Sequence, residues 1–182
     1  MIVVCGKLDA RGSTASLAVS IAERAAASVD RPGTVQFVGV VPDTADGDRS
    51  VQALVTAGVG HAAVMRGADR ALEAGDVDLA VRYLPDVHVT VGVDLSAEAT
   101  AALTAAAGFA GAASIVVTGA ASVDAGRDVG AASPTFALEA PANDPDGTFA
   151  GFVALLAVRL DAGDEPAVAW HATIRDLAVD AV

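Results

Sequence analysis

Residues 140–182 read APANDPDGTFAGFVALLAVRLDAGDEPAVAWHATIRDLAVDAV, and this stretch decides how the rest of the chain is interpreted. It opens with a loop rich in Pro, Asn, Asp and Gly and continues into an apolar segment that predicts a helix from near Thr148. A second helix is expected after Pro166. The first turn of a helix has backbone N–H groups without partners and a partial positive charge. A loop that ends there is therefore a natural site for an anion.

Short apolar segments alternate with segments of helical periodicity along the chain. We expect strands at residues 2–5, 35–41, 62–65, 87–93, 114–118 and 135–138, and helices at residues 15–28, 49–57, 66–74, 77–84 and 97–109. Asp46 is the expected N-cap of the helix at residues 49–57. Because the strands are apolar throughout and separated by helices, they indicate a mainly parallel sheet covered on both faces. The sequence therefore predicts one three-layer α/β/α domain over residues 1–182.

The loop before Thr148 resembles the signature segment of the ribokinase-like (PfkB-type) carbohydrate kinases. In that family a Gly-Ala-Gly-Asp loop opens a helix, binds the phosphates and supplies the catalytic base. Here residues 144–147 read Asp-Pro-Asp-Gly, and residues 148–151 read Thr-Phe-Ala-Gly, which keeps the Thr-Phe-x-Gly of the family. The frame of the signature is present, but Gly147 stands where the resemblance places the catalytic carboxylate.

Further stretches resemble the same family, in the same order along the chain. Residues 36–48 resemble a strand and the loop after it, and residues 115–120 resemble the strand whose Thr-x-Gly end faces ATP. Asp9 is similar to the residue that contacts sugar hydroxyls. Gly12 and Ser13 resemble the glycine-rich helix start beneath the sugar. The resemblance implies a ribokinase-like core.

The resemblance also implies a sugar-like substrate, with ATP and Mg²⁺ as cofactors. The residues that it implies for binding are Asp9, Gly12 and Ser13 for the substrate and Thr118, Gly119, Gly147 and Thr148 for the nucleotide. Asp146 is the candidate catalytic base, because it lies one residue before the expected position.

Three departures argue against an active kinase. Asp9 and Gly12 are almost adjacent, whereas the family inserts a small β-lid between these features, and lid closure excludes water during phosphoryl transfer. A shift of one residue at a helix start rotates Asp146 by about 100°. Pro145 removes a backbone N–H from the loop. Helix capping or turn formation is the favoured role for Asp144 and Asp146.

The composition is strongly acidic, with a net charge of −12 and Lys7 as the only lysine. Such a surface repels nucleic acid and anionic membranes. It suggests a cytoplasm of high salt, where charges are screened, although codon bias of a GC-rich genome gives a similar composition. No apolar run approaches the roughly 20 residues of a membrane span, and residues 1–9 do not resemble a signal peptide. We expect a cytoplasmic protein.

Other catalytic chemistry has little support in the sequence. The three histidines are far apart and form no His-x-x-x-His pair, so no metal site is expected. Cys5 lies in an apolar run and is interpreted as a core residue. Ser13 lacks the context of a nucleophile elbow. The first loop has no Gly-x-Gly-x-x-Gly fingerprint of a dinucleotide fold.

Three functions follow from these observations. The leading hypothesis is a non-catalytic or reduced carbohydrate kinase homologue that retains nucleotide or small-ligand binding. One alternative is an active small-molecule kinase that transfers phosphate from ATP to a sugar-like hydroxyl, with Asp146 as its base. The other alternative is a structural or interaction protein that forms a homodimer through a sheet edge or an apolar face.

Overall fold

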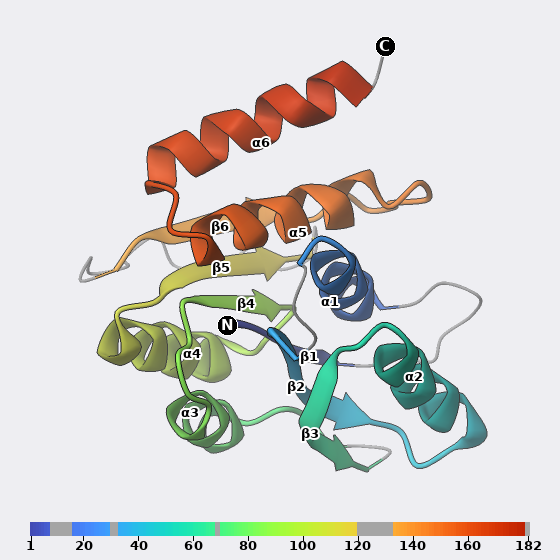
Figure 1. The fold of residues 1–182 in the computed structure, drawn as a ribbon. Coiled ribbons are helices and arrows are strands. Elements are labelled where there is room, and N and C mark those ends of the chain that lie inside the picture. The colour runs from blue at the N-terminus through green and yellow to red at the C-terminus, as the bar shows by residue number, and fades with distance from the viewer. Residues whose placement is uncertain (8–15, 30–32, 68–69, 120–132, 181–182) are drawn as a thin grey trace.

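The structure is a computed structural model that describes residues 1–7, 16–29, 33–67, 70–119 and 133–180. Strands and helices alternate along it, as Figure 1 shows. They are β1 (Ile2–Lys7), α1 (Leu17–Ala27), β2 (Val35–Val41), α2 (Ala45–Thr56), β3 (Gly60–Arg66), α3 (Ala74–Tyr83), β4 (Val89–Val93), α4 (Ala97–Ala110), β5 (Ala113–Thr118), β6 (Thr135–Glu139), α5 (Thr148–Asp161) and α6 (Pro166–Asp180). None of the helices within these ranges is long and apolar enough to cross a membrane.

The described strands form a six-stranded sheet in the order β3-β2-β1-β4-β5-β6. Every neighbouring pair is parallel, which confirms the mainly parallel sheet that the sequence predicts. β1 lies inside the sheet, with Ile2 opposite Val35 on one side and Val89 on the other. A strand with neighbours on both sides and helices on both faces must be apolar throughout, as residues 2–5 are.

The side chains of β1 separate the core into two layers. Ile2 and Val4 pack in the cluster that contains buried residues of α1, α2 and α5, whereas Val3 and Cys5 pack in the cluster that contains those of α3 and α4. This is the alternation of successive side chains across a strand. The predicted three-layer α/β/α arrangement is therefore confirmed.

Helix α6 lies beyond the β6 edge of the sheet and packs on α5 (Figure 1). Trp170 stacks on Phe136 of β6, with ring centroids 5.8 Å apart, and meets Phe152 of α5 edge-on at 5.2 Å. Arg159 of α5 also forms an ion pair with Asp176 of α6. These contacts join α6 to the edge strand, and covering an edge in this way protects its unpaired backbone groups.

The helix expected at residues 66–74 is wrong. β3 continues through Arg66, residues 70–73 have no regular structure, and α3 begins at Ala74. The reason is local, because the Asp76 carboxylate accepts the Glu73 N–H at 3.2 Å and the Arg70 guanidinium at 2.7 Å. The charged side chains therefore fix the start of α3 instead of extending a helix backwards.

The N-cap of α2 also differs from the prediction. Thr44 is the N-cap, since its Oγ1 accepts the Gly47 N–H at 3.2 Å, and Asp46 lies inside the helix. Asp46 and Asp48 occupy the first turn, where the helix dipole favours negative side chains. Residues 45–48, expected as part of an acidic loop, therefore form the first turn of α2.

Candidate functional site

The sheet order identifies where a ligand site is expected. In open parallel sheets, ligands bind outside the carboxyl ends of the strands, at the point where the chain connections diverge. Here the chain runs outward from β1 through β2 to β3, and from β4 through β5 to β6 on the other side. The point of divergence lies between β1 and β4. The carboxyl edge at these central strands is therefore the candidate site.

Asp94 follows β4 directly and joins two strands at this edge. Its Oδ1 accepts the Gly119 N–H at 2.6 Å, and its own N–H donates to the Val117 carbonyl at 3.0 Å. Its φ of 48° lies in the left-handed region, which residues other than glycine rarely adopt. The structure therefore holds an exposed carboxylate in a strained conformation at the carboxyl edge. Such strain is concentrated at functional sites.

Thr118 and Gly119, implied for the nucleotide, lie at the carboxyl end of β5. The Thr118 hydroxyl donates to the Leu138 carbonyl at 3.5 Å, and the Ala140 N–H donates to the Thr118 carbonyl at 2.8 Å. These bonds join β5 to β6. Gly119 contacts Asp94, so the two residues contribute to the same edge from which the loop before α5 departs.

The start of α5 is already capped by a carboxylate. Asp144 Oδ1 accepts the Phe149 N–H at 3.0 Å, and its Oδ2 accepts the Ala150 N–H at 2.9 Å. Gly147 is the N-cap residue, and Thr148 is the first residue of the helix. The predicted capping role of Asp144 is confirmed. Two of the donors that a phosphate would use at this helix start are bound to the protein's own anion.

Arg24 of α1 supports the loop before α5 from the other side. Its Nη2 donates to the Asp146 carbonyl at 3.4 Å. A Cβ at Gly147 would lie 2.1 Å from the same Nη2, and Gly147 has a φ of 66°. Glycine is therefore favoured at residue 147 by its left-handed backbone conformation, and it leaves room for the guanidinium beside it.

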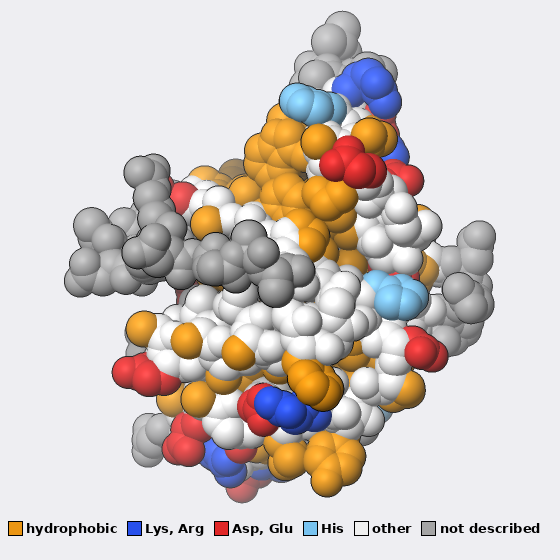
Figure 2. Space-filling view, turned by 90° about the vertical axis from the view of Figure 1, so that its left-hand side faces the viewer, with side chains coloured by type: hydrophobic (Ala, Val, Ile, Leu, Met, Phe, Trp, Pro, Cys, Tyr) orange, Lys and Arg blue, Asp and Glu red, His pale blue; other side chains and the backbone are white. Residues whose placement is uncertain are grey.

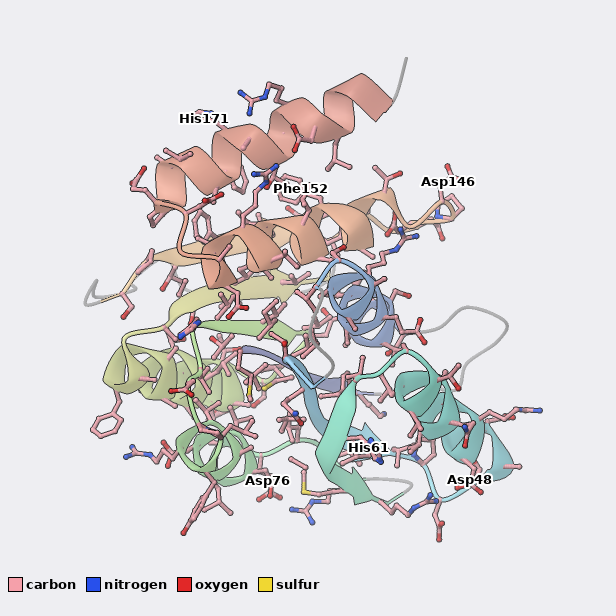
Figure 3. The ribbon with its side chains drawn as sticks, in the orientation of Figure 1. Asp48, His61, Asp76, Asp146, Phe152 and His171 are labelled. Atoms are coloured by element: carbon pink, nitrogen blue, oxygen red, sulfur yellow. The ribbon has the colours of Figure 1, made fainter. Side chains whose placement is uncertain are left out.

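Asp146, the candidate base, is exposed in the turn before α5. Figure 3 shows it at the outer end of the loop that connects β6 and α5. The structure brings its backbone, rather than its carboxylate, into contact with Arg24. Asp9, Gly12 and Ser13, implied for the substrate, lie outside the described residues.

The histidines and the cysteine do not gather at this edge. His61 on β3 and His171 on α6 lie far apart in Figure 3. His88 Nδ1 lies 3.0 Å from Asp161 Oδ1, next to the amino end of β1. Burial raises the pKa of the Cys5 thiol to about 12, so the thiol stays protonated. Among the described residues, no three His, Cys, Asp or Glu side chains are close enough to hold a metal ion.

Two site residues were not predicted from the sequence. Asp94 had a signal, because it is the first polar residue after an apolar strand, at the end of the strand where ligands bind in parallel sheets. Arg24 had none, since its contact with Asp146 joins residues 122 positions apart. The periodicity of α1 shows which of its faces is apolar, but not which loop its exposed arginine meets.

Solved structures are similar to this fold at low sequence identity. A protein of E. coli described as ribokinase II, in complex with ATP and Mg²⁺, aligns with a TM-score of 0.62 at 10% identity, over 94% of this chain and 89% of that chain. Ribokinase from Giardia lamblia aligns with a TM-score of 0.62 at 12% identity, over 97% and 90%. A protein of Agrobacterium tumefaciens described as a ribokinase aligns with a TM-score of 0.56 at 13% identity, over 93% of this chain and 87% of that chain.

No protein-family model matches the sequence, and no curated protein matches it either. The likeness therefore rests on the arrangement of the strands and helices, and it agrees with the resemblance that the loop before Thr148 carries. The chain has a ribokinase-like α/β/α fold.

Proposed function

We propose that this chain is a ribokinase-like protein that does not transfer phosphate and that binds a small polyhydroxylated molecule at the carboxyl edge of its sheet. The observation that carries this proposal is the Asp144 carboxylate on the first N–H groups of α5. A phosphate at that helix start would have to displace a tethered carboxylate, or lie beside it and be repelled. The chain's own anion thus competes with a nucleotide for the donors.

The candidate base supports the same conclusion. Phosphoryl transfer requires a carboxylate at the attacking hydroxyl, donors for the phosphate and a divalent ion. Asp146 is exposed at the outer end of the loop, and residue 147 has no side chain. ATP and Mg²⁺, present in the similar E. coli structure, therefore do not fit the α5 start while Asp144 remains bound there.

Asp94 is the residue that we assign to ligand binding. Its exposed carboxylate is fixed by the bond from Gly119 and lies at the edge where parallel sheets bind ligands. A carboxylate accepts hydrogen bonds from hydroxyl groups. A nucleoside or a free sugar supplies such hydroxyls without a charged phosphate. The proposed ligand class is therefore neutral and polyhydroxylated.

Isothermal titration of adenosine and of ATP with Mg²⁺ tests the proposal. We expect adenosine to bind the wild-type chain more tightly than ATP, and we expect Asp144→Ala to strengthen ATP binding at least tenfold while leaving adenosine binding unchanged. Asp94→Asn should weaken adenosine binding. The proposal fails if ATP binds the wild type tenfold more tightly than adenosine does, or if the chain phosphorylates adenosine, ribose or fructose.

Titrations with ribose and fructose separate the two parts of the proposal. If adenosine, ribose and fructose all give no heat at millimolar concentration, the ligand-binding part is wrong, whereas the absence of phosphoryl transfer is judged by the kinase assay alone.

A further inference from the structure

We propose that two copies of this chain associate through the outer face of α3, related by a two-fold axis that passes near Leu79. This surface, which we call the α3 face, consists of Gly75, Asp78, Leu79, Arg82 and Tyr83. It belongs to the layer that α3 and α4 form on one face of the sheet. The inference does not depend on the proposed function.

Large apolar side chains are exposed here in a chain that has few aromatic residues. Leu79 is 58% exposed, Tyr83 is 81% exposed, and Phe109 of the neighbouring helix α4 is 79% exposed. The Arg82 guanidinium lies 5.1 Å from the centre of the Phe109 ring, which joins the two helices into one patch. Figure 2 shows hydrophobic side chains beside a basic and an acidic group over this part of the surface. Tyrosine and arginine are enriched at the centres of interfaces.

The spacing along α3 makes this face complementary to itself. Gly75, Leu79 and Tyr83 are four residues apart, so they form one stripe along the helix. When two such helices pack antiparallel about Leu79, Tyr83 of each copy lies over Gly75 of the other. A Cβ at Gly75 would meet nothing within 4 Å, so there is open space for a ring. Large and small residues then alternate across the contact.

The charges of the α3 face agree with the same arrangement. Asp78 and Arg82 form an ion pair at 2.8 Å on one flank of the stripe. In this antiparallel pair, the side of α3 that carries Asp78 and Arg82 faces the same side of α3 in the other copy. Arg82 of each copy therefore lies beside Asp78 of the other. The chain as a whole carries a net charge of −12, so most pairs of its surfaces repel. The α3 face brings one positive and one negative group from each copy, and this balance favours a second copy as the partner.

Sedimentation velocity of the full chain over a wide concentration range tests the inference. We expect the mass to approach twice 17.9 kDa at high concentration, and Leu79→Glu to return it to 17.9 kDa across the same range. Val168→Glu on α6 is the matched control, because Val168 is 57% exposed and lies on a different surface. It should leave the dimer intact. Since both residues are exposed, far-UV circular dichroism should be unchanged in both variants.

Cross-linking of Leu79→Cys tests the axis. Two copies related by an axis near residue 79 should form a disulfide at that position under mild oxidation, giving a dimer on a non-reducing gel. The native cysteine, Cys5, is fully buried, so the wild-type chain should stay monomeric on the same gel. The inference is overturned by a wild-type chain that is monomeric at every concentration, by a Leu79→Glu dimer, or by a dimer in which Leu79→Cys does not cross-link.

Discussion

Helices α4 and α5 each follow a strand of the parallel sheet, β4 and β6, but they begin in different ways. Ser96 precedes α4 directly, and its hydroxyl accepts a single N–H, that of Ala99, at 3.2 Å. At α5 the cap residue is Gly147, and the carboxylate of Asp144 accepts two N–H groups from further back along the chain. α1 and α2 resemble α4, because Ser or Thr caps each of them.

The difference teaches that α5 departs from these three helices for a reason specific to its loop, because one carboxylate from before the cap position accepts two N–H groups. α1, α2 and α4 are closed by a neutral hydroxyl next to the helix. α3 and α6 are closed by a carboxylate at the helix itself, that of Asp76 for the Glu73 N–H and that of Glu165 for the Val168 N–H. At α5 the cap residue is a glycine without a side chain, and the carboxylate of Asp144 occupies the helix start where the resemblance places a phosphate. Four substitutions would sharpen or break this comparison.

Asp144→Ala should have the largest effect. It removes a charged acceptor from two N–H groups at a half-buried helix start, so we expect a loss of about 2–3 kcal/mol in the free energy of unfolding. Urea unfolding followed by circular dichroism measures it. Asp144→Asn should lose less stability than Asp144→Ala, because its amide keeps one oxygen that can accept an N–H. A loss below that of Ser96→Ala would contradict the special role of the carboxylate.

Gly147→Ala comes next, with an expected loss of about 2 kcal/mol. The left-handed φ of 66° accounts for about 1.5 kcal/mol of this loss, and displacement of the exposed Arg24 guanidinium accounts for at most about 0.5 kcal/mol. Gly111→Ala is the control, since Gly111 has a similar φ of 70° and nothing lies within 4 Å of the added Cβ. Equal losses in the two variants would show that Arg24 is not held against the loop.

Ser96→Ala should cost about 1 kcal/mol, the usual value for a neutral N-cap that satisfies one N–H. The same urea measurement gives the reference against which the α5 cap is compared. If this variant is as unstable as Asp144→Ala, then the two helix starts are equivalent, and the comparison does not stand.

Arg24→Gln should have the smallest effect on stability, at most about 0.5 kcal/mol. Its hydrogen bond to the Asp146 carbonyl is long at 3.4 Å, and the side chain is exposed. A combined Arg24→Gln and Gly147→Ala variant should lose less than the sum of the single losses, because the clash has been removed. Strict additivity in thermal or urea unfolding would argue against direct contact.

Much of the fold could be predicted from the sequence because its signals are local. The strand expected at residues 35–41 has those bounds in the structure, since a continuous apolar run ends in a proline. The start of α5 near Thr148 was also predicted, because a Pro-Asp-Gly loop precedes an apolar periodic segment. The helix expected at residues 66–74 failed because Asp76 fixes a later start. Periodicity does not report how charged side chains pair.

The candidate site was less predictable. That Asp144 would cap a helix followed from its residue type and position, but the two N–H groups that it reaches depend on how the whole loop folds back. The strained φ of Asp94 has no sequence signal, since aspartate is common in ordinary turns. Long-range contacts such as that of Arg24 with the loop require the packing of α1 beside α5, which only the assembled sheet determines.

The ring of Trp170 gives this protein an internal optical reporter. It is the only tryptophan of the chain, and it lies between Phe136 of the edge strand and Phe152 of α5. Its emission should therefore shift to longer wavelength when α6 detaches and water reaches the indole. A fluorescence transition at lower urea concentration than the loss of helical circular dichroism would reveal an opening of the sheet edge that precedes global unfolding.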